Sequence, residues 1–134
     1  MSGNRPIVQD QGGLQRPARA GDGAISALLP TVVTTDANTT LTAAQMAGGV
    51  VQYTGFTAGR TITTDTAANI IAAFPQLDIG DSLEVIVSIT TAFAGTWVAG
   101  TGVTLAGRAT VVANTQQTVL FTKTSATEVT LRAL

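Results

Sequence analysis

Alternating apolar and polar residues at positions 83–91, LEVIVSITT, constrain the fold of this chain more than any other feature. In an extended strand, Leu83, Val85, Val87 and Ile89 point to one face and the residues between them point to the other. Alternation with a period of two predicts a strand that is buried on one face only. This segment is the strongest strand candidate in the sequence.

Other segments rich in Thr and Val, residue types that favour sheets, surround it. Positions 31–35 and 50–56 are strand candidates, and 60–64 is expected to pair with 50–56 across the turn at Ala58 and Gly59. Gly, Asn and Ser turns follow about every 8–12 residues, a rhythm typical of an antiparallel sandwich or barrel. The shorter candidates are 95–98, 101–105, 108–113, 118–122 and 128–134.

Two short helices are also predicted. The segment 42–49, TAAQMAGG, has Thr42 and Gln45 in the positions of a capping box and ends in two glycines. The segment 65–75, DTAANIIAAFP, has apolar residues at helical spacing and ends at Pro75. Residues 31–134 are therefore expected to form a mainly β domain, an antiparallel β-sandwich or barrel-like fold with two short helices.

The first thirty residues differ from the rest of the chain. They contain five Gly, three Pro and three Arg, and their apolar residues are too sparse for a regular period. Pro and Gly at this density predict an extended N-terminal arm or linker over 1–30, with a disordered tail as the alternative.

Composition excludes several kinds of chemistry. The chain has no Cys and no His, which removes disulfides, thiolate metal sites and the commonest general base. Its net charge is -1 and its basic residues are scattered, so neither nucleic acid nor a membrane surface is an expected partner. We expect a soluble protein, made in the cytoplasm, without a secretion signal or a membrane span. Because only 11% of residues are charged and mean hydropathy is positive, we expect partner subunits to cover much of the surface.

Two motifs have alternative interpretations. Asp78, Asp81 and Glu84 could hold a hard cation or supply a pair of hydrolytic carboxylates, but a turn followed by a solvent-facing Glu explains them better. The glycines at 100–107 superficially suggest a phosphate-binding loop, but their spacing fits neither known fingerprint, and tight hairpin turns explain them better.

Side chains suited to catalysis or sugar binding are few. Tyr53 and Trp97 could stack on a sugar, although separated aromatics more often serve a core or an interface. The serines have no His as a base and none lies in a nucleophile elbow. We therefore expect no catalytic residue, no metal and no cofactor, and hence a protein that is not an enzyme.

Several segments together resemble a known family: LTAAQMAGGVVQYTG, TDTAANIIAAFP, GDSLEVIVSITTAFAGTWVAGTGVTLAG and ATVVANTQQTVLFTKTSATEVTL. Their order is similar to a β-domain of tailed-phage structural proteins, especially capsid decoration (cement) proteins and head fibres. The resemblance covers about two-thirds of the chain. It implies a virion component, often a homotrimer, that binds the capsid by backbone and apolar contacts and has no catalytic residues.

The resulting hypothesis is a decoration protein on the capsid surface of a bacteriophage virion, bound to the outside of the major capsid protein and to copies of itself. The arm would lie across the major capsid protein or a neighbouring copy and gain main-chain hydrogen bonds. Its few groups capable of strong contact are the candidate anchors. They are Arg5, Ile7, Val8, Leu14, Arg16, Arg19, Ile25, Leu28 and Leu29.

Two alternatives come from other functional classes. A head-fibre or tail-fibre adhesion module that binds host-surface glycans would need an aromatic-lined groove. A small glycan hydrolase would need two carboxylates about 5–10 Å apart in a cleft, and the sequence offers poor material for it.

Overall fold

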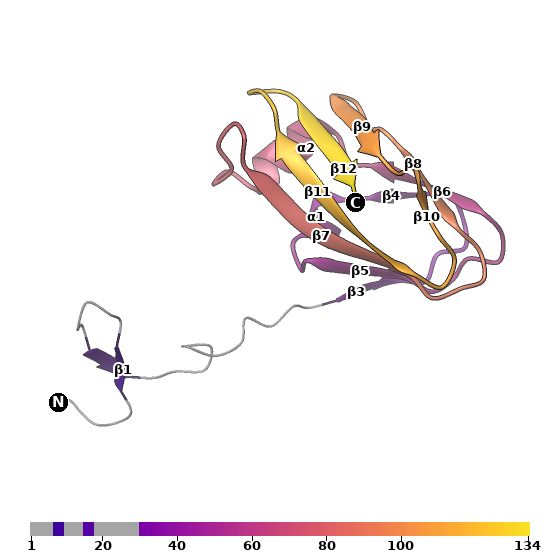
Figure 1. Cartoon of the computed structure of the whole chain (residues 1–134), viewed down its shortest axis with the longest axis horizontal. Coiled ribbons are helices and arrows are strands. Elements are labelled where there is room, and N and C mark those ends of the chain that lie inside the picture. Colours follow the sequence, from indigo (N-terminus) through magenta and orange to yellow (C-terminus); the bar gives the residue numbers. More distant parts are fainter. Residues whose placement is uncertain (1–6, 10–14, 18–29) are drawn as a thin grey trace.

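The computed structural model describes residues 7–9, 15–17 and 30–134. The prediction of a mainly β fold with two short helices is confirmed, and most strands belong to two stacked sheets (Figure 1). Within the arm region, β1 (Ile7–Gln9) and β2 (Gln15–Pro17) form an antiparallel pair of their own.

The larger sheet has six strands and the smaller sheet has four. The order in the six-stranded sheet is β3 (Thr31–Val33), β5 (Val50–Tyr53), β7 (Ser82–Ile89), β11 (Gln116–Lys123), β12 (Val129–Ala133) and β9 (Val103–Gly107). The order in the four-stranded sheet is β10 (Thr110–Val111), β8 (Gly95–Val98), β6 (Arg60–Thr64) and β4 (Thr39–Leu41). The helices are α1 (Ala43–Met46) and α2 (Ala67–Ala73).

The first half of the domain winds as a parallel coil. Strands β3, β5 and β7 are parallel neighbours in one sheet, and β4, β6 and β8 are parallel neighbours in the other. The connections 34–38, 54–59 and 90–94 therefore all cross between the sheets at the same end of the domain, which we call the crossover end. The helices α1 and α2 return the chain between the sheets at the opposite end.

This winding corrects two expectations. Both sheets mix parallel and antiparallel pairs, whereas turn spacing suggested purely antiparallel pairing. Strand 60–64 does not pair with 50–53, because the connection 54–59 crosses to the other sheet instead of closing a hairpin. Phe56 lies in that connection and is buried in the core, which anchors the crossing.

The C-terminal part adds one reversed strand beside the coil in each sheet. Strand β11 runs antiparallel to β7 and β12, and β10 runs antiparallel to β8. Strand β9 then joins the outer side of β12 in parallel. Strand β12 therefore runs in the same direction as β7, and so does β9 at the edge of the sheet.

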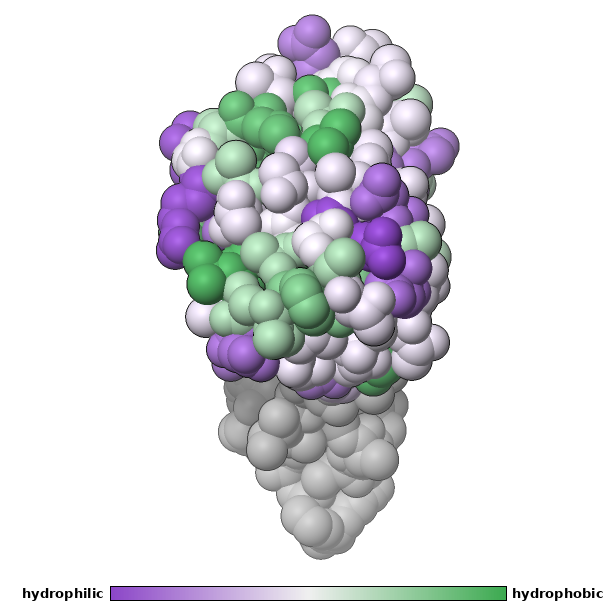
Figure 2. Space-filling view, turned by 90° about the vertical axis from the view of Figure 1, so that its right-hand side faces the viewer, coloured by the Kyte–Doolittle hydropathy of each residue, from purple (hydrophilic) through white to green (hydrophobic). Residues whose placement is uncertain are grey.

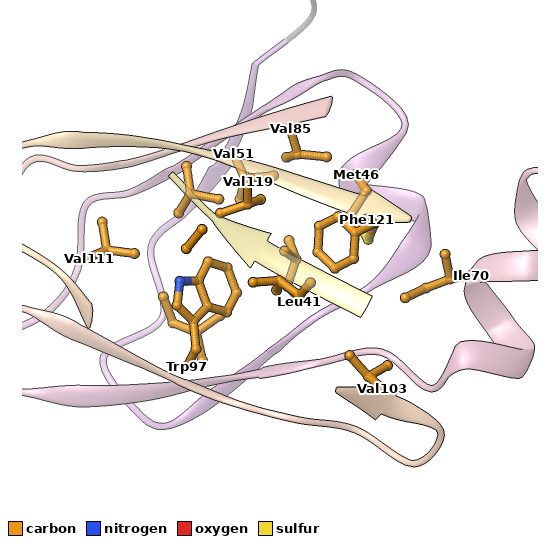
Figure 3. Packing of buried hydrophobic residues seen from close by; sticks show 14 of the residues in the cluster. Leu41, Met46, Val51, Ile70, Val85, Trp97, Val103, Val111, Val119 and Phe121 are labelled. Carbon is orange, nitrogen blue, oxygen red and sulfur yellow. The ribbon is translucent and has the colours of Figure 1, made fainter. Parts of the chain in front are cut away.

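The core fills the space between the two sheets (Figure 3). The alternation predicted for 83–89 is confirmed, because Val85, Val87 and Ile89 are buried while Glu84 is exposed. Figure 3 shows Phe121 of β11 in the same part of the core as Met46 and Ile70 of the two helices. The helices therefore close one end of the sandwich with their apolar faces.

A buried polar contact joins the two sheets. The indole Nε1 of Trp97 in β8 donates to Oε1 of Gln117 in β11 at 2.8 Å, and the Gln117 amide donates to the carbonyl of Thr110 at 3.1 Å. Both side chains are buried, and their polar groups are satisfied by each other and by the backbone. The contact sets the position of β8 and β10 relative to β11.

Both predicted helix starts are confirmed. The Thr42 hydroxyl accepts from the Gln45 N–H at 3.2 Å, and the Gln45 side-chain oxygen accepts from the Thr42 N–H at 3.0 Å, which completes the capping box. Thr66 caps α2 by accepting from the Asn69 N–H at 3.1 Å.

Asp65 links the starts of the two helices. One carboxylate oxygen accepts from the Ala43 N–H at the start of α1 (2.9 Å). The other accepts from the Thr66 N–H and from the Asn69 amide at the start of α2, both at 2.8 Å. Partial burial acts to raise the pKa of Asp65, but these three hydrogen bonds outweigh it and hold the pKa below its usual 3.8.

We expect Asp65→Ala to lower the free energy of unfolding at neutral pH by about 2 kcal/mol, because three donors at two helix starts lose a charged acceptor. A carboxylate with a lowered folded-state pKa contributes stability above its unfolded value of 3.8 and loses it as the pH falls through the folded value. Urea denaturation between pH 7 and pH 2 should therefore show the wild-type advantage shrinking below about pH 4.

The matched control is Asp78→Ala, because the Asp78 side chain is exposed and its recorded hydrogen bonds are made by its backbone. An equal loss for the two variants, or a gap that does not depend on pH, would contradict the role given to Asp65.

Candidate functional site

The most distinctive surface is the solvent side of the six-stranded sheet, here called the outer face. Side chains on β5, β7, β11 and β12 that alternate with the core residues point away from the core and are half-buried or exposed. The outer face consists of Val50, Gln52, Ser82, Glu84, Ile86, Ser88, Gln116, Thr118, Leu120, Thr122, Thr130, Arg132 and Leu134.

An apolar row crosses the middle of the outer face. Val50 of β5 lies beside Ile86 of β7, and Ile86 lies beside Thr118 of β11. Leu134 follows in line, because its N–H donates to the Thr118 carbonyl at 3.0 Å, and its side chain is 57% exposed. Three of the four side chains in this row are aliphatic, so water is excluded favourably when a partner covers it.

The next row carries the charges of the outer face. Leu120 of β11 is registered with Glu84 of β7 on one side and with Arg132 of β12 on the other. Neighbouring strands are about 5 Å apart, so the backbones of Glu84 and Arg132 are about 10 Å apart with a leucine between them. All other residues of the outer face are neutral.

A hydroxyl row borders the charged row. Thr122 of β11 is registered with Ser82 of β7 and with Thr130 of β12. The Ser82 and Thr122 hydroxyl oxygens are 2.7 Å apart and hydrogen-bonded. Because the Ser82 and Thr122 hydroxyls already bond to each other, a partner protein that covers them would leave fewer polar groups without a hydrogen bond.

A shallow hollow of about 340 Å³ lies where the outer face meets the crossover end. Hydroxyl and amide groups dominate its lining, and Asn114 adopts a positive φ of 54°. The lining residues are Ser88, Ile89, Thr90, Asn114, Thr115 and Gln116.

The crossover end is held by one ion pair. Asp36 accepts from the Thr57 N–H at 2.9 Å, and from Nη2 of Arg60 at 2.8 Å. The pKa of Asp36 is lowered to about 2, mainly by its hydrogen bonds from Thr57 and further by Arg60.

Figure 2 looks onto the right-hand side of Figure 1 and shows apolar residues in separate groups, divided by neutral and polar ones. This view offers no single continuous apolar area.

The predicted arm anchors are only partly covered by the structure. Ile7 and Val8 lie in β1 and Arg16 lies in β2, with Val8 registered opposite Arg16. The other anchors fall outside the described residues. They are Arg5, Leu14, Arg19, Ile25, Leu28 and Leu29.

The acidic motif is divided between a turn and a strand. The Asp81 carboxylate accepts from the Asp78 N–H at 2.9 Å, which is the turn that the sequence predicted, and Glu84 lies on the outer face. Across the described residues, no three acidic side chains gather in a way that could hold a metal ion.

The glycine segment 100–107 does not form the expected hairpin. Strand β8 belongs to the small sheet and β9 to the large one, so the turn at Gly100 and Gly102 carries the chain between sheets. Gly102 has a φ of 81°, a conformation that side chains disfavour, and a Cβ at Gly100 would overlap the carbonyl oxygen of Thr64.

The two candidate sugar-stacking residues are buried. Tyr53 is fully buried and stacks on Phe56 with ring centroids 5.4 Å apart, and Trp97 is 3% exposed. Burial raises the pKa of Tyr53 above its usual range. Neither ring can stack on a sugar from solvent.

The common row of Glu84, Leu120 and Arg132 on the outer face was not predicted from the sequence. Alternation in 83–91 predicted that Glu84 points away from the core, which is where the structure places it, and Arg132 is exposed on the same face. Their common row with Leu120 depends on the register of three strands, and alternation alone carries no information about register.

No helix in the part of the chain described by the structure is long and apolar enough to cross a membrane. The chain matches no protein-family model, no curated protein and no solved structure.

Proposed function

We propose that this protein is a decoration (cement) protein of a tailed-phage virion that binds the outer surface of the major capsid protein and stabilises the head. The observation that carries the proposal is the outer face, a broad sheet surface with an apolar middle row and only two charges. Continuous weakly charged surfaces of this kind are characteristic of protein–protein contacts. The segments that resemble phage decoration proteins, and a chain with only 11% charged residues, support the same conclusion.

Cementing follows from contact with more than one subunit. A domain that binds two adjacent capsid subunits must lose part of its interface when they separate, so its binding energy opposes the internal pressure of a filled head. The two sheets share one core and are joined by the hydrogen bond between Trp97 and Gln117. A domain held together in this way is suited to resisting such separation. This mechanism requires contact area and rigidity, and no chemical step.

The arm supplies a second attachment. A short extended segment can add to the edge of a partner sheet, where affinity comes from main-chain hydrogen bonds and depends little on side-chain charge. Three arms that belong to one homotrimer would bind with avidity, since the first attachment raises the local concentration of the others.

Deleting residues 2–29 tests the role of the arm. Undecorated heads of the parent phage are mixed with the full chain or with the shortened chain, and the retained protein is measured after sedimentation. We expect full occupancy for the intact chain and at least a tenfold weaker retention for the shortened one, because the avidity of three arms is lost.

The shortened chain must keep the unfolding midpoint of the full chain, which separates lost attachment from lost folding. Equal retention of both chains would contradict the role of the arm. Failure of the intact chain to bind heads at all would contradict the decoration function.

The polar hollow at the crossover end favours a second candidate function, a head-fibre or tail-fibre module that binds host glycans. Its hydroxyl and amide groups are suited to hydrogen bonding with sugar hydroxyls. Burial of Tyr53 and Trp97, however, removes both aromatic rings that a sugar platform was expected to use. Binding of the intact chain to a host glycan in a calorimeter would favour this candidate over decoration.

A further inference from the structure

We propose that Ile79 is a hot-spot residue of the contact between this protein and its protein partner, and that it enters an apolar pocket with basic side chains on its rim. The proposal rests on the proposed function, in which that partner is the major capsid protein, and specifies the chemistry of one point of contact. Its evidence lies in the connection from α2 to β7.

Residues 78–81 form a tight turn that continues directly into a β-bulge. The Asp81 N–H donates to the Asp78 carbonyl at 2.9 Å, and Gly80, at the third position of the turn, has a φ of 98°. The Gly80 N–H donates to the Lys123 carbonyl at 2.7 Å, and the Lys123 N–H donates to the Asp81 carbonyl at 3.0 Å. Gly80 and Asp81 therefore oppose a single residue of β11, as in a bulge that begins with glycine, and such bulges redirect side chains where strand pairing ends.

Side chains hold the turn in addition to its backbone. The Asp81 carboxylate accepts from the Asp78 N–H at 2.9 Å, and the Lys123 ammonium donates to the Leu77 carbonyl at 3.2 Å. The Ile79 side chain takes no part in these bonds and is 64% exposed, the largest fraction among the large apolar side chains that the structure describes. Because the turn is already fixed, placing this side chain against a partner costs little conformational entropy.

The surroundings of Ile79 are acidic. Asp78 and Asp81 lie on either side of it in the turn, and both are exposed. Glu128 is exposed in the turn between β11 and β12, at the same end of the domain. Lys123 is half-buried, and its ammonium is bonded to a backbone carbonyl. The complementary partner surface is therefore an apolar pocket that carries basic residues on its rim.

The turn is continuous with the outer face. Asp81 precedes Ser82 of β7, and Lys123 follows Thr122 of β11, so the bulge comes directly after the hydroxyl row. A capsid protein that covers the hydroxyl row therefore also reaches the turn. The outer face supplies contact area, and Ile79 sets the position of the partner along the strands.

Retention on undecorated heads of the parent phage tests the role of Ile79 in the full-length chain. The protein retained after sedimentation is measured for the wild type, Ile79→Ser and Ile79→Leu. We expect retention of Ile79→Ser to be roughly tenfold weaker or more, because truncating a hot-spot residue removes a large share of the binding energy. Ile79→Leu keeps the apolar volume and should be retained like the wild type.

Val112→Ser is the matched control, because Val112 is also aliphatic and 44% exposed but lies in the connection between β10 and β11 at the crossover end. It should be retained like the wild type. All variants should keep the wild-type thermal midpoint, since exposed residues contribute little to folding.

Asp78→Lys tests the basic rim of the pocket. Its retention should fall at low salt, because like charges then meet, and should recover at high salt, where charges are screened.

Each contrary result is informative. Unchanged retention of Ile79→Ser, or an equal loss for Val112→Ser, would overturn the role of Ile79 while leaving the decoration function intact. Failure of the wild type to bind heads would overturn the decoration function and the role of Ile79 with it. Unchanged retention of Asp78→Lys at low salt would overturn the basic rim.

Discussion

Phe121→Ala is expected to lower the free energy of unfolding by about 3–5 kcal/mol, the usual cost of emptying a buried aromatic site. The Phe121 ring is fully buried and lies in the core with Met46 and Ile70, where the helices meet the sheets (Figure 3). Its strand β11 is hydrogen-bonded on both sides, so the backbone cannot easily move to fill the space. Urea denaturation followed by circular dichroism measures the loss.

Phe93→Ala is the matched control, because the Phe93 side chain is 42% exposed in the connection between β7 and β8. Its truncation should change the free energy of unfolding by about 0.5 kcal/mol or less. Equal losses at the two positions would show that Phe121 is not at the centre of the core.

Gly55→Ala is expected to cost about 3 kcal/mol, because the added methyl group has no space. A Cβ at Gly55 would overlap the carbonyl oxygen and carbon of Thr34, which are backbone atoms and cannot rotate away as a side chain can. Relief requires the 34–38 and 54–59 connections to separate, and with them the hydrogen bond from the Thr54 N–H to the Val33 carbonyl.

Gly59→Ala provides the comparison within the same connection. Its Cβ would come no closer than 4.0 Å to the carbonyl oxygen of Ala94, an ordinary contact distance. Thermal unfolding of both variants should show a clear drop in midpoint for Gly55→Ala alone. A small effect at Gly55 would mean that the two connections are not packed as closely as described.

Local features of this fold could be predicted from sequence because their causes are local. The strand at 83–91 follows from alternation, and both helix starts follow from Thr42 and Thr66 beside residues that complete their caps. These patterns involve neighbours within a few positions, so no knowledge of the rest of the chain was required.

Strand order could not be predicted in the same way. The turn residues Ala58 and Gly59 are compatible with a hairpin, yet the burial of Phe56 and the close approach of Gly55 to Thr34 direct the chain to the other sheet. Such contacts join segments about 20 residues apart, and alternation within a strand does not encode them. The outer face was hidden for the same reason, since its rows exist only after the strands are in register.

The direction of β3 has a mechanical consequence for the arm. Thr31 begins this strand at the helix-bearing end of the sheet, β3 is parallel to β5, and β12 ends at the opposite end. A pull on Thr31 directed away from the crossover end would therefore act in line with the strands and load all three residue pairs between β3 and β5 at once. Tension in that direction would meet more resistance than a sideways force, which could unzip the edge one bond at a time.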